Sequence, residues 1–582
     1  MSAVEVSTTT LGDGRLGFSS EQDLDQFIAM LGRFESGEVS ADDWRVFRLV
    51  NGVYGQRQDD VHMIRTKIPQ GILSATQLDA LAEVCEKWTH GKGHITTRQN
   101  IQFHFVKLDD VEDALKALSA VGMTTREACG NAVRNVTGCP FAGVSEQELF
   151  DATPYAEAVT RHMLRGPWSS SLPRKFKIAF GGCCGGDCIQ AAINDLGFLQ
   201  RIQDGKRGFR VTMGGGTATL RKNGVLVHEF LPVEEILEVA EAIVRTFHRI
   251  GNRKDKHKAR LKWAIQKVGI DAFIAEYKSD REAIKAEGGR PLVLGPVRAT
   301  RLPVEPQELL AAPLPDFEAF VARNVRAQKQ AGFSSVAVRL ILGDMIPAQM
   351  RGLATVVRKY ADGELRTTNE QNLVLRFVPN WQLSALHREL VGLGLGAIGP
   401  KSIADVVACP GASSCKLAVT QSRGLASLLG EHFDKNPDIA ALAPNMDIKI
   451  SGCPNGCGQH HISGVGFQGA VRKVDGKSVP QYFLMLGGSL KADGAVFNRI
   501  AAKVPARRIP EAMNRLLKMY AAEKTEGEAP EDYFARVELP KVQTLLKDLI
   551  EMDAATATAE DFIDLGETRA FEVVLQEGEC AA

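Results

Sequence analysis

Two halves of this 582-residue sequence repeat one another. Residues 76–106 align without gaps on residues 348–378, an offset of 272 positions, and QNIQFHFV at 99–106 matches QNLVLRFV at 371–378. In both copies a helix-like apolar pattern precedes a polar turn and an alternating, strand-like run. Later in each copy, Cys139-Pro140 corresponds to Cys409-Pro410. The chain is therefore predicted to contain two copies of one two-part unit, which gives a pseudo-two-fold molecule with its functional groups where the copies meet.

We expect an α+β fold from this duplication, with a smaller half-domain and a larger α/β lobe in each copy. The predicted boundaries are an N-terminal arm at 1–55, half-domain 1 at 56–120, lobe 1 at 121–285, half-domain 2 at 320–395, lobe 2 at 396–550 and a C-terminal tail at 551–582.

The charge balance excludes several classes of partner. Lys plus Arg and Asp plus Glu each total 70, so nothing indicates a nucleic-acid or membrane partner. No uninterrupted apolar run is long enough to span a bilayer, and the N-terminus does not resemble a signal peptide. We therefore expect a cytoplasmic protein, in which clustered cysteines serve more often as metal ligands or redox groups than as a disulfide framework.

Four cysteines of the second copy form the strongest candidate metal site. Cys409 and Cys415 lie in the sequence CPGASSC, and Cys453 and Cys457 lie in CPNGC. Four thiolates can bind a single Zn²⁺ or anchor a [4Fe–4S] cluster. The five-residue gap fits a zinc knuckle poorly, and the nearby Gly and Pro residues suit the close backbone approach that a cluster needs. The spacing favours iron–sulfur and leaves a zinc-stabilised, non-redox binding protein as the alternative from another class.

The first copy retains an incomplete version of this site. Cys139, Cys184 and Cys188 match three of the four cysteines, but Ser145 stands where Cys415 would be expected. Oxygen is a poor match for this chemistry, so we interpret the first-copy site as degenerate and leave open a second metal site. Cys580, near the C-terminus, is predicted to be an exposed thiol.

Basic residues are concentrated in turn-flanked segments of the same first copy. Lys175 and Lys177 alternate on a predicted strand and should project to one face, and Arg98 and Arg134 lie in neighbouring motifs. Each one alone is usually a solvated surface charge. Together they suit the binding of a small oxyanion or a polycarboxylate cofactor.

The ordered set of motifs resembles the sulfite/nitrite reductase haemoprotein family, most closely a bacterial assimilatory sulfite reductase. The similarity rests on TTRQNIQFH, the RNV segment, PRKFK, the Gly214-Gly215-Gly216 turn, and the pair CPGASSC and SGCPNGCG, and it extends from about residue 50 to about residue 550. The family implies ferredoxin-like half-domains that alternate with two α/β lobes that bind sirohaem and a [4Fe–4S] cluster. Its cluster is held by four cysteines, of which one, Cys457 by position, also bridges to the sirohaem iron.

The resemblance also assigns roles to individual residues. Arg98, Arg134, Lys175 and Lys177 would bind the anion and supply protons, acting as the catalytic set. The residues expected to contact the cofactors are Cys457, Asn455, Gln102, His104, Asn135, Gly214, Gly215 and Gly216. The implied reaction is the six-electron reduction of sulfite to sulfide.

The alternative substrate on the same fold is nitrite, which would be reduced to ammonia. Plant-type members of the family that reduce nitrite tend to carry Asn where this chain has Lys177, and two lysines suit the dianion sulfite, so the sequence favours sulfite. Without a flavin or nicotinamide motif, electrons are expected from a separate protein, a ferredoxin or a flavoprotein reductase. The basic stretch at 248–267 is either a solvated helix face or a docking surface for such a donor.

Overall fold

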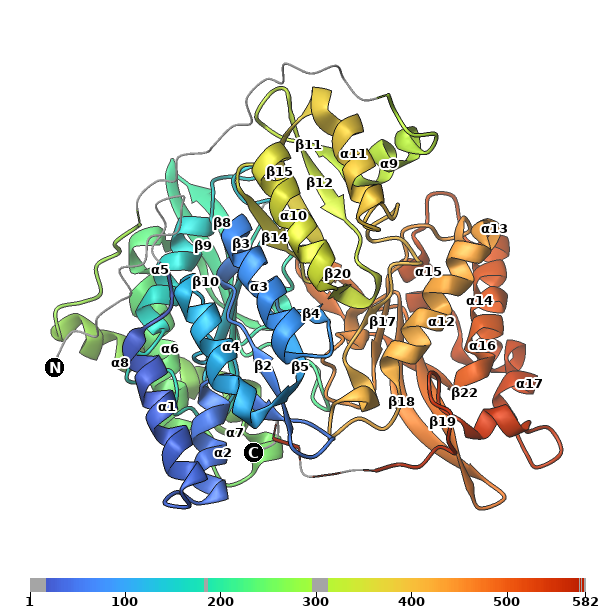
Figure 1. Cartoon of the computed structure of the whole chain (residues 1–582), viewed down its shortest axis with the longest axis horizontal. Coiled ribbons are helices and arrows are strands. Elements are labelled where there is room, and N and C mark those ends of the chain that lie inside the picture. Colours follow the sequence, from blue (N-terminus) through green and yellow to red (C-terminus); the bar gives the residue numbers. More distant parts are fainter. Residues whose placement is uncertain (1–16, 183–186, 296–311, 575, 577, 580–582) are drawn as a thin grey trace.

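The computed structural model describes residues 17–182, 187–295, 312–574, 576 and 578–579. Over this part of the chain, four five-stranded sheets and one two-stranded sheet confirm the predicted α+β class. The two half-domains meet in the middle of the molecule, and the lobes of the first and second copy lie on either side of them (Figure 1).

The half-domains exchange one short strand each. Sheet 1 has the order β1-β2-β5-β4-β13 and sheet 2 the order β11-β12-β15-β14-β3, so β3 of the first copy completes the second sheet, and β13 of the second copy completes the first. The strands are β1 (Val53–Gly55), β2 (Val61–Arg65), β3 (Ile72–Ser74), β4 (Gly93–Ile95), β5 (Ile101–Lys107), β11 (Val325–Ala327), β12 (Phe333–Val338), β13 (Asp344–Met345), β14 (Glu364–Thr367) and β15 (Leu373–Pro379). This exchange makes the two half-domains one composite domain.

Helices from both copies cover these sheets. Ser74 and Gln77 form a capping box at the start of α3 (Ala75–Trp88), which satisfies backbone N–H groups that the first turn leaves without partners. Helix α3 packs against its repeat mate α10 (Pro347–Tyr360), as Figure 1 shows. The remaining helices of this domain are α4 (Leu108–Ala120), α9 (Phe317–Asn324) and α11 (Leu383–Gly392). One buried apolar cluster runs through both half-domains, so neither has a core of its own.

Each lobe contains a mixed sheet. The three strands of each sheet that come first in the sequence are parallel to one another. Lobe 1 has the order β10-β9-β8-β7-β6 and lobe 2 the order β16-β17-β18-β19-β22. The strands are β6 (Val133–Gly138), β7 (Phe176–Gly181), β8 (Leu196–Gln203), β9 (Lys206–Met213), β10 (Val225–Pro232), β16 (Val407–Ala408), β17 (Ile448–Ser451), β18 (Val465–Val474), β19 (Lys477–Leu486) and β22 (Arg499–Pro505). Strands β20 (Ser489–Lys491) and β21 (Gly494–Val496) pair separately in lobe 2.

Each lobe buries its own apolar core beneath flanking helices. In lobe 1 the helices are α5 (Thr153–Met163), α6 (Ile236–Ile250), α7 (Leu261–Val268) and α8 (Ile270–Ala286). In lobe 2 they are α12 (Ser422–Lys435), α13 (Pro437–Ala440), α14 (Ile509–Glu523), α15 (Pro530–Arg536), α16 (Leu539–Leu545) and α17 (Lys547–Ile550). The parallel strands matter for function because their carboxyl ends meet at one edge of each sheet.

The chain termini pack against the first half-domain. The segment predicted as an arm forms α1 (Glu21–Glu35) and α2 (Ala41–Val50), and its last residues form β1. Near the C-terminus, the buried Glu579 carboxylate accepts hydrogen bonds from both terminal nitrogens of the Arg48 guanidinium and, at 2.7 Å, from the Gly55 backbone N–H. The last described residues of the chain are thereby fixed to α2 and β1. Cys580 lies outside the described residues.

Candidate active site

The four second-copy cysteines lie at the carboxyl ends of two adjacent parallel strands. Cys409 directly follows β16, and Cys453 and Cys457 follow β17. The short turn at 410–414 brings Cys415 back toward them, because the Cys415 N–H donates to the Gly411 carbonyl at 3.0 Å. Strand pairing therefore explains how residues more than forty positions apart reach one place.

The thiols influence one another electrostatically. Burial raises the pKa of Cys453 well above its usual range, and repulsion from the thiols of Cys457, Cys409 and Cys415 raises it further. Burial also raises the pKa of Cys409, whose sulfur accepts a hydrogen bond from the Gly452 N–H at 3.3 Å. Four thiols that oppose one another's ionisation need a positive partner to become thiolates, which is what a metal cluster supplies. Within the described part of the chain, no three His, Cys, Asp or Glu side chains have the spacing of a site for a metal ion.

The first-copy cysteines have a different arrangement. Cys139 is disulfide-bonded, and its sulfur lies 3.6 Å from that of Cys188. Cys184 lies outside the described residues. The sequence predicted that the cysteines do not form a disulfide framework, and the structure has an oxidised cysteine at Cys139.

Predicted cationic residues converge where half-domain 1 meets lobe 1. Arg98 donates to the Asn194 side chain at 2.5 Å and to the Asn135 carbonyl at 2.6 Å. Lys177 lies on β7 and Lys175 directly precedes it. Burial lowers the pKa of Lys177 well below its usual range, and the positive charges of Arg260, Arg98 and Lys175 lower it further. We refer to Arg98, Lys175, Lys177, Arg260 and Lys262 as the cationic face.

Two members of the cationic face were not predicted as site residues. Arg260 forms an ion pair with the buried Asp195 at 2.6 Å, and Asp195 also accepts from the Lys177 backbone N–H at 2.9 Å. Burial, together with the charge of Arg260, lowers the pKa of Lys262 to about 7. Both residues belong to the basic stretch at 248–267. That stretch therefore divides into an exposed part, which includes Lys254, and a part that turns inward.

Arg134 lies beside this face with its guanidinium on backbone carbonyls. It donates to the carbonyls of Gly130 at 2.7 Å and Ala128 at 3.1 Å. Arg65, which the sequence did not single out, donates to the same Ala128 carbonyl at 3.4 Å. The Gln102 amide, with its oxygen turned toward Arg65, accepts from that guanidinium at 2.9 Å. Gln102 is thus linked to Arg134 through Arg65 and the Ala128 carbonyl, and Arg65, at the end of β2, has no local sequence pattern that marks it as a site residue.

Several expected cofactor neighbours have buried polar atoms without a partner. Asn135 donates to the Ile68 carbonyl at 2.7 Å, but its side-chain oxygen accepts nothing from the described residues. His104 contacts Gln56 at 3.1 Å through Nδ1, while its Nε2 finds no partner in that same part of the chain. Burial lowers the pKa of His104 to about 3, so it is neutral. Unsatisfied buried atoms are costly in a native protein and are expected where a ligand supplies the missing partner.

The Gly214-Gly215-Gly216 turn permits a close backbone approach. A Cβ at Gly215 would collide with the Ala192 carbonyl, and Gly214 has a φ of 78°, which favours glycine. A Cβ at Gly216 would lie 3.1 Å from the Lys262 ammonium. The three glycines therefore let this turn pack closely against the segment at 192–194 and against α7. Asn455 is exposed, and its backbone N–H contributes a hydrogen bond that lowers the pKa of Cys453.

One turn connects the cysteines to the cationic face. The Thr97 hydroxyl donates to the Cys457 carbonyl at 2.9 Å, and the next residue, Arg98, reaches into the cationic face. Cys457 is exposed, whereas Cys409 and Cys453 are buried. The exposed cysteine of the quartet is therefore the one that adjoins the positive charge of the first copy.

The related surface of the second copy is charge-balanced. Position 370, the repeat mate of Arg98, is a glutamate, and Glu370 pairs with Lys401 at 3.4 Å. Lys449 pairs with Asp447 at 3.1 Å. On the cationic face, Asp195 pairs with Arg260, and the positive charges of Arg260, Arg98 and Lys175 all act on Lys177. Several positive charges buried together are costly unless anions neutralise them.

The residues present fit a sirohaem and a cluster. Sirohaem carries eight carboxylates, and the clustered cations, with the unpaired side-chain atoms of Asn135 and His104, supply partners that such a group needs. The four converging thiols provide the donor set of a [4Fe–4S] cluster. We refer to this region, between Cys457 and the cationic face, as the central site.

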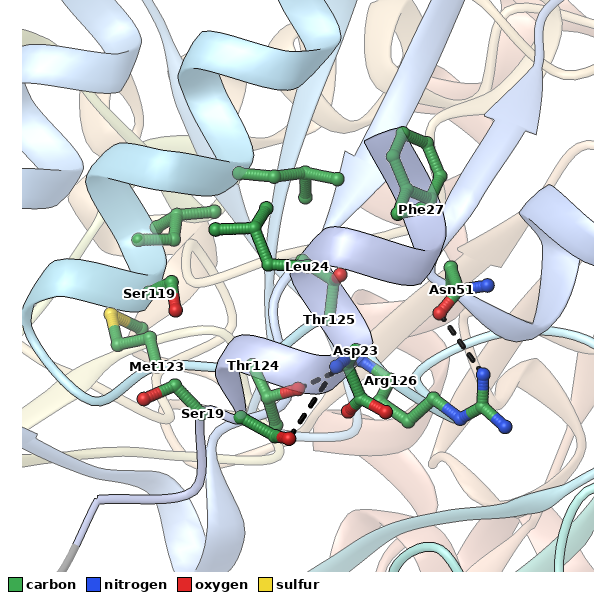
Figure 2. A pocket seen from close by; sticks show the side chains of 13 residues that line it. Ser19, Asp23, Leu24, Phe27, Asn51, Ser119, Met123, Thr124, Thr125 and Arg126 are labelled. Carbon is green, nitrogen blue, oxygen red and sulfur yellow. Dashed lines mark hydrogen bonds between the residues drawn. The ribbon is translucent and has the colours of Figure 1, made fainter. Parts of the chain in front are cut away.

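A separate small cavity lies beneath α1, away from the central site. Figure 2 shows it between α1 and the end of α4, where Arg126 donates to Asn51 at 3.2 Å. Its volume is about 30 Å³, close to the room that a single water molecule occupies.

None of the helices in the described residues could cross a membrane.

Family comparisons agree with this architecture. The nitrite and sulphite reductase 4Fe-4S domain matches residues 129–285 and 400–549, and the nitrite/sulfite reductase ferredoxin-like half domain matches residues 54–121 and 326–393. Each family therefore matches once in each copy of the repeat. This confirms the duplicated fold with ferredoxin-like half-domains.

Individual relatives cover most of the chain. A ferredoxin–nitrite reductase of Synechococcus elongatus is 31% identical over 78% of this chain and 85% of its own length. The chloroplastic ferredoxin–nitrite reductase of Zea mays is 29% identical, over 86% of both chains. The solved structure of the Mycobacterium tuberculosis NirA protein is similar with a TM-score of 0.74 and 27% identity, over 89% of this chain and 97% of that one. The chain belongs to the nitrite and sulfite reductase haemoprotein family, whose sirohaem and [4Fe–4S] cluster are its cofactors.

Proposed function

We propose that this oxidoreductase reduces nitrite to ammonia. The reaction consumes one nitrite ion, six electrons and eight protons, and it gives one ammonium ion and two water molecules. The observation that carries the proposal is the position of the exposed Cys457 beside the cationic face. When bound, the [4Fe–4S] cluster on Cys409, Cys415, Cys453 and Cys457 and the sirohaem supply the electrons singly. The chain itself must bind the anion, orient it and deliver protons.

The cationic face supplies these functions. Arg98 is fixed by Asn194 and by the Asn135 carbonyl, so its charge is preorganised. Lys177 and Lys262 have pKa values lowered by burial, which makes each a better proton donor than a solvated lysine. Lys175 adds charge to the same region, and Arg134 and Arg65 extend it. A small oxyanion in front of these groups would gain charge-assisted hydrogen bonds and a supply of protons.

Nitrite replaces sulfite as the preferred substrate because of the comparisons. The sequence favoured sulfite on the ground that Lys177 stands where plant-type nitrite reductases tend to carry Asn. Relatives over most of this chain are nevertheless named ferredoxin–nitrite reductases, from cyanobacteria and chloroplasts. A strongly positive face attracts monoanions and dianions alike in sign, although the dianion more strongly. The extra lysine therefore does not exclude nitrite. Sulfite reduction remains the second candidate.

A ferredoxin is the proposed electron donor. The relatives from Synechococcus elongatus and Zea mays are named as ferredoxin-dependent. In this chain, Arg253, Lys254, Lys256, His257 and Lys258 form an exposed basic segment that leads to Arg260 of the cationic face. Such a segment would attract an acidic protein by complementary charge.

Turnover of the holoprotein with nitrite and with sulfite tests the proposal. With reduced ferredoxin or reduced methyl viologen as donor, we expect ammonia from nitrite with a higher kcat/KM than sulfide from sulfite. Arg98→Gln should lower kcat/KM for nitrite by roughly 100-fold, because one preorganised donor is lost. The matched control is Glu370→Gln at the repeat-related position, which should leave nitrite turnover unchanged. Faster sulfide formation, or an equal loss in both variants, would overturn the proposal.

A further inference from the structure

Gln371 contacts three separate parts of the molecule from a strained turn. Its backbone has a φ of 64°, a region that side-chain-bearing residues seldom occupy, and its side chain is buried. The amide oxygen accepts from the Ala408 N–H at 3.0 Å, directly before Cys409. The amide nitrogen donates to the Ile95 carbonyl at 2.8 Å and contacts His94 Nε2 at 3.2 Å. One side chain of half-domain 2 thereby connects half-domain 1 to the first cysteine of lobe 2.

The repeat supplies a matched residue at the other site. Gln99, with a φ of 60°, accepts from the Gly138 N–H at 2.9 Å, directly before Cys139, and donates to the Thr367 carbonyl at 2.8 Å. Both turns are built alike. In one, Thr96 accepts from the Asn100 N–H at 3.2 Å, and in the other, Thr368 accepts from the Asn372 N–H at 3.1 Å. The same strained glutamine therefore controls the residue before the first cysteine in both copies.

A chain of buried and half-buried polar groups adds to Gln371. His94 Nδ1 lies 3.1 Å from the Asp344 carboxylate, and Asp344 also accepts from Arg423. With Nδ1 protonated, His94 donates to Asp344 and accepts from Gln371 through Nε2, which satisfies both ring nitrogens. The repeat mate of His94 is Arg366, so this chain belongs to the second copy.

Arg423, the last of these polar groups, adjoins a second residue that contacts Cys409. Arg423 lies on α12 next to Ser422, whose hydroxyl donates to the Cys409 carbonyl at 2.9 Å. That hydroxyl oxygen is also 3.3 Å from the Cys409 sulfur. Two side chains therefore fix the backbone around Cys409: Gln371 binds the N–H of the preceding residue, Ala408, and Ser422 binds the carbonyl of Cys409 itself. Both contacts are buried, where hydrogen bonds fix geometry most strongly.

We propose that Gln371 is a positioning residue for the cluster ligand Cys409. It sets the Cys409 backbone through the Ala408 N–H, and His94, Asp344 and Arg423 hold its amide in the required orientation. The inference rests on the proposed assignment of Cys409 as a cluster ligand. Groups that orient a ligand affect both how tightly the metal is bound and its reduction potential.

The experiment compares two isosteric variants of the holoprotein, Gln371→Met and Gln99→Met. Both remove a buried amide at a positive φ, so a general loss of packing affects both alike. The readouts are iron and acid-labile sulfide per chain, the rate of iron loss to a chelator, and the midpoint potential of the cluster by redox titration. We expect Gln371→Met to lose iron about 10-fold faster than the unmodified protein and to have a shifted potential. Gln99→Met should match the unmodified protein in both.

Two further variants keep the outcome decisive. If Gln371→Met does not fold, Ser422→Ala removes the other Cys409 contact with a smaller change and should shift the potential in its place. Cys409→Ser tests the ligand assignment separately, because full cluster content in that variant would remove the basis of the inference. Equal iron-loss rates and equal potentials in Gln371→Met and Gln99→Met, with Cys409→Ser depleted of cluster, would overturn the positioning role alone.

Discussion

At the scale of single residues, the central site depends on positive charge held out of water. The positive charge of Arg260 acts on both Lys177 and Lys262, and the carboxylate of Asp195, which pairs with Arg260, partly offsets it. Because burial and the charge of Arg260 lower their pKa values, the ammonium groups of Lys177 and Lys262 lose their protons more easily than solvated lysines do. Such groups bind anions most strongly while they are still protonated.

This arrangement predicts a pH dependence of anion binding. The folded-state pKa of Lys262 is about 7, lowered from 10.5 by burial, and a bound anion raises it. Anion binding therefore takes up a proton at and above about pH 7, and affinity should fall by up to about 10-fold per pH unit. The measurement is the dissociation constant of nitrite, followed by absorption, across about one pH unit on each side of 7. Lys262→Met should flatten this dependence, and an unchanged slope in that variant would contradict the assignment.

At the scale of elements, strand exchange and end-to-end contacts hold the copies together. Strands β3 and β13 each complete the sheet of the other copy. The C-terminal segment returns to α2 through the pair between Arg48 and Glu579, whose side chains are 9% and 7% exposed. These contacts join segments hundreds of residues apart, and each is buried.

The contact between Arg48 and Glu579 should contribute measurably to stability. Glu579→Ala leaves the buried Arg48 guanidinium without its carboxylate, which we expect to lower the free energy of unfolding by about 3 kcal/mol. Urea denaturation measures this change, and limited proteolysis should show earlier cleavage of the C-terminal segment. The double variant Arg48→Met with Glu579→Leu should recover most of the loss, because no unpaired charge remains. Similar stability in Glu579→Ala and the unmodified protein would show that the contact is not structural.

At the scale of the whole molecule, the two copies form one folding unit with two unequal faces. The buried cluster of the half-domains draws on both copies, and the polar turns at 96–100 and 368–372 each reach across to the opposite copy. One copy presents the cysteine quartet and the other presents the cations. The duplicated fold therefore has one proposed reaction site rather than two.

This predicts that neither copy folds alone. A fragment of residues 1–295 lacks β13 and half of the shared core, so it should be unfolded or insoluble when expressed alone. Co-expression with residues 312–582 should give a soluble complex that binds iron. Circular dichroism and size-exclusion chromatography measure both outcomes. A cooperative thermal transition in the first fragment alone would contradict the prediction.

The amino-acid sequence by itself determined the repeat, the element types and the cysteine quartet. A duplication shows as an offset of 272 residues, and α3 and α10 begin and end at that offset. Cys453 and Cys457 were predicted as cluster ligands because their short spacing is visible within a local stretch of the chain, and this assignment stays a prediction. The cationic residues Arg98, Lys175 and Lys177 were found through their motifs, and the structure brings these three together.

Tertiary structure decided which residues complete the site. Arg65, Arg260 and Lys262 carry no local signal, because their role comes from contacts with Ala128, Asp195 and Thr217 far away in the chain. The exchange of β3 and β13 likewise depends on strand pairing across long separations. A sequence encodes periodicity and spacing directly. Which charges are buried beside which partners is fixed only when distant strands meet.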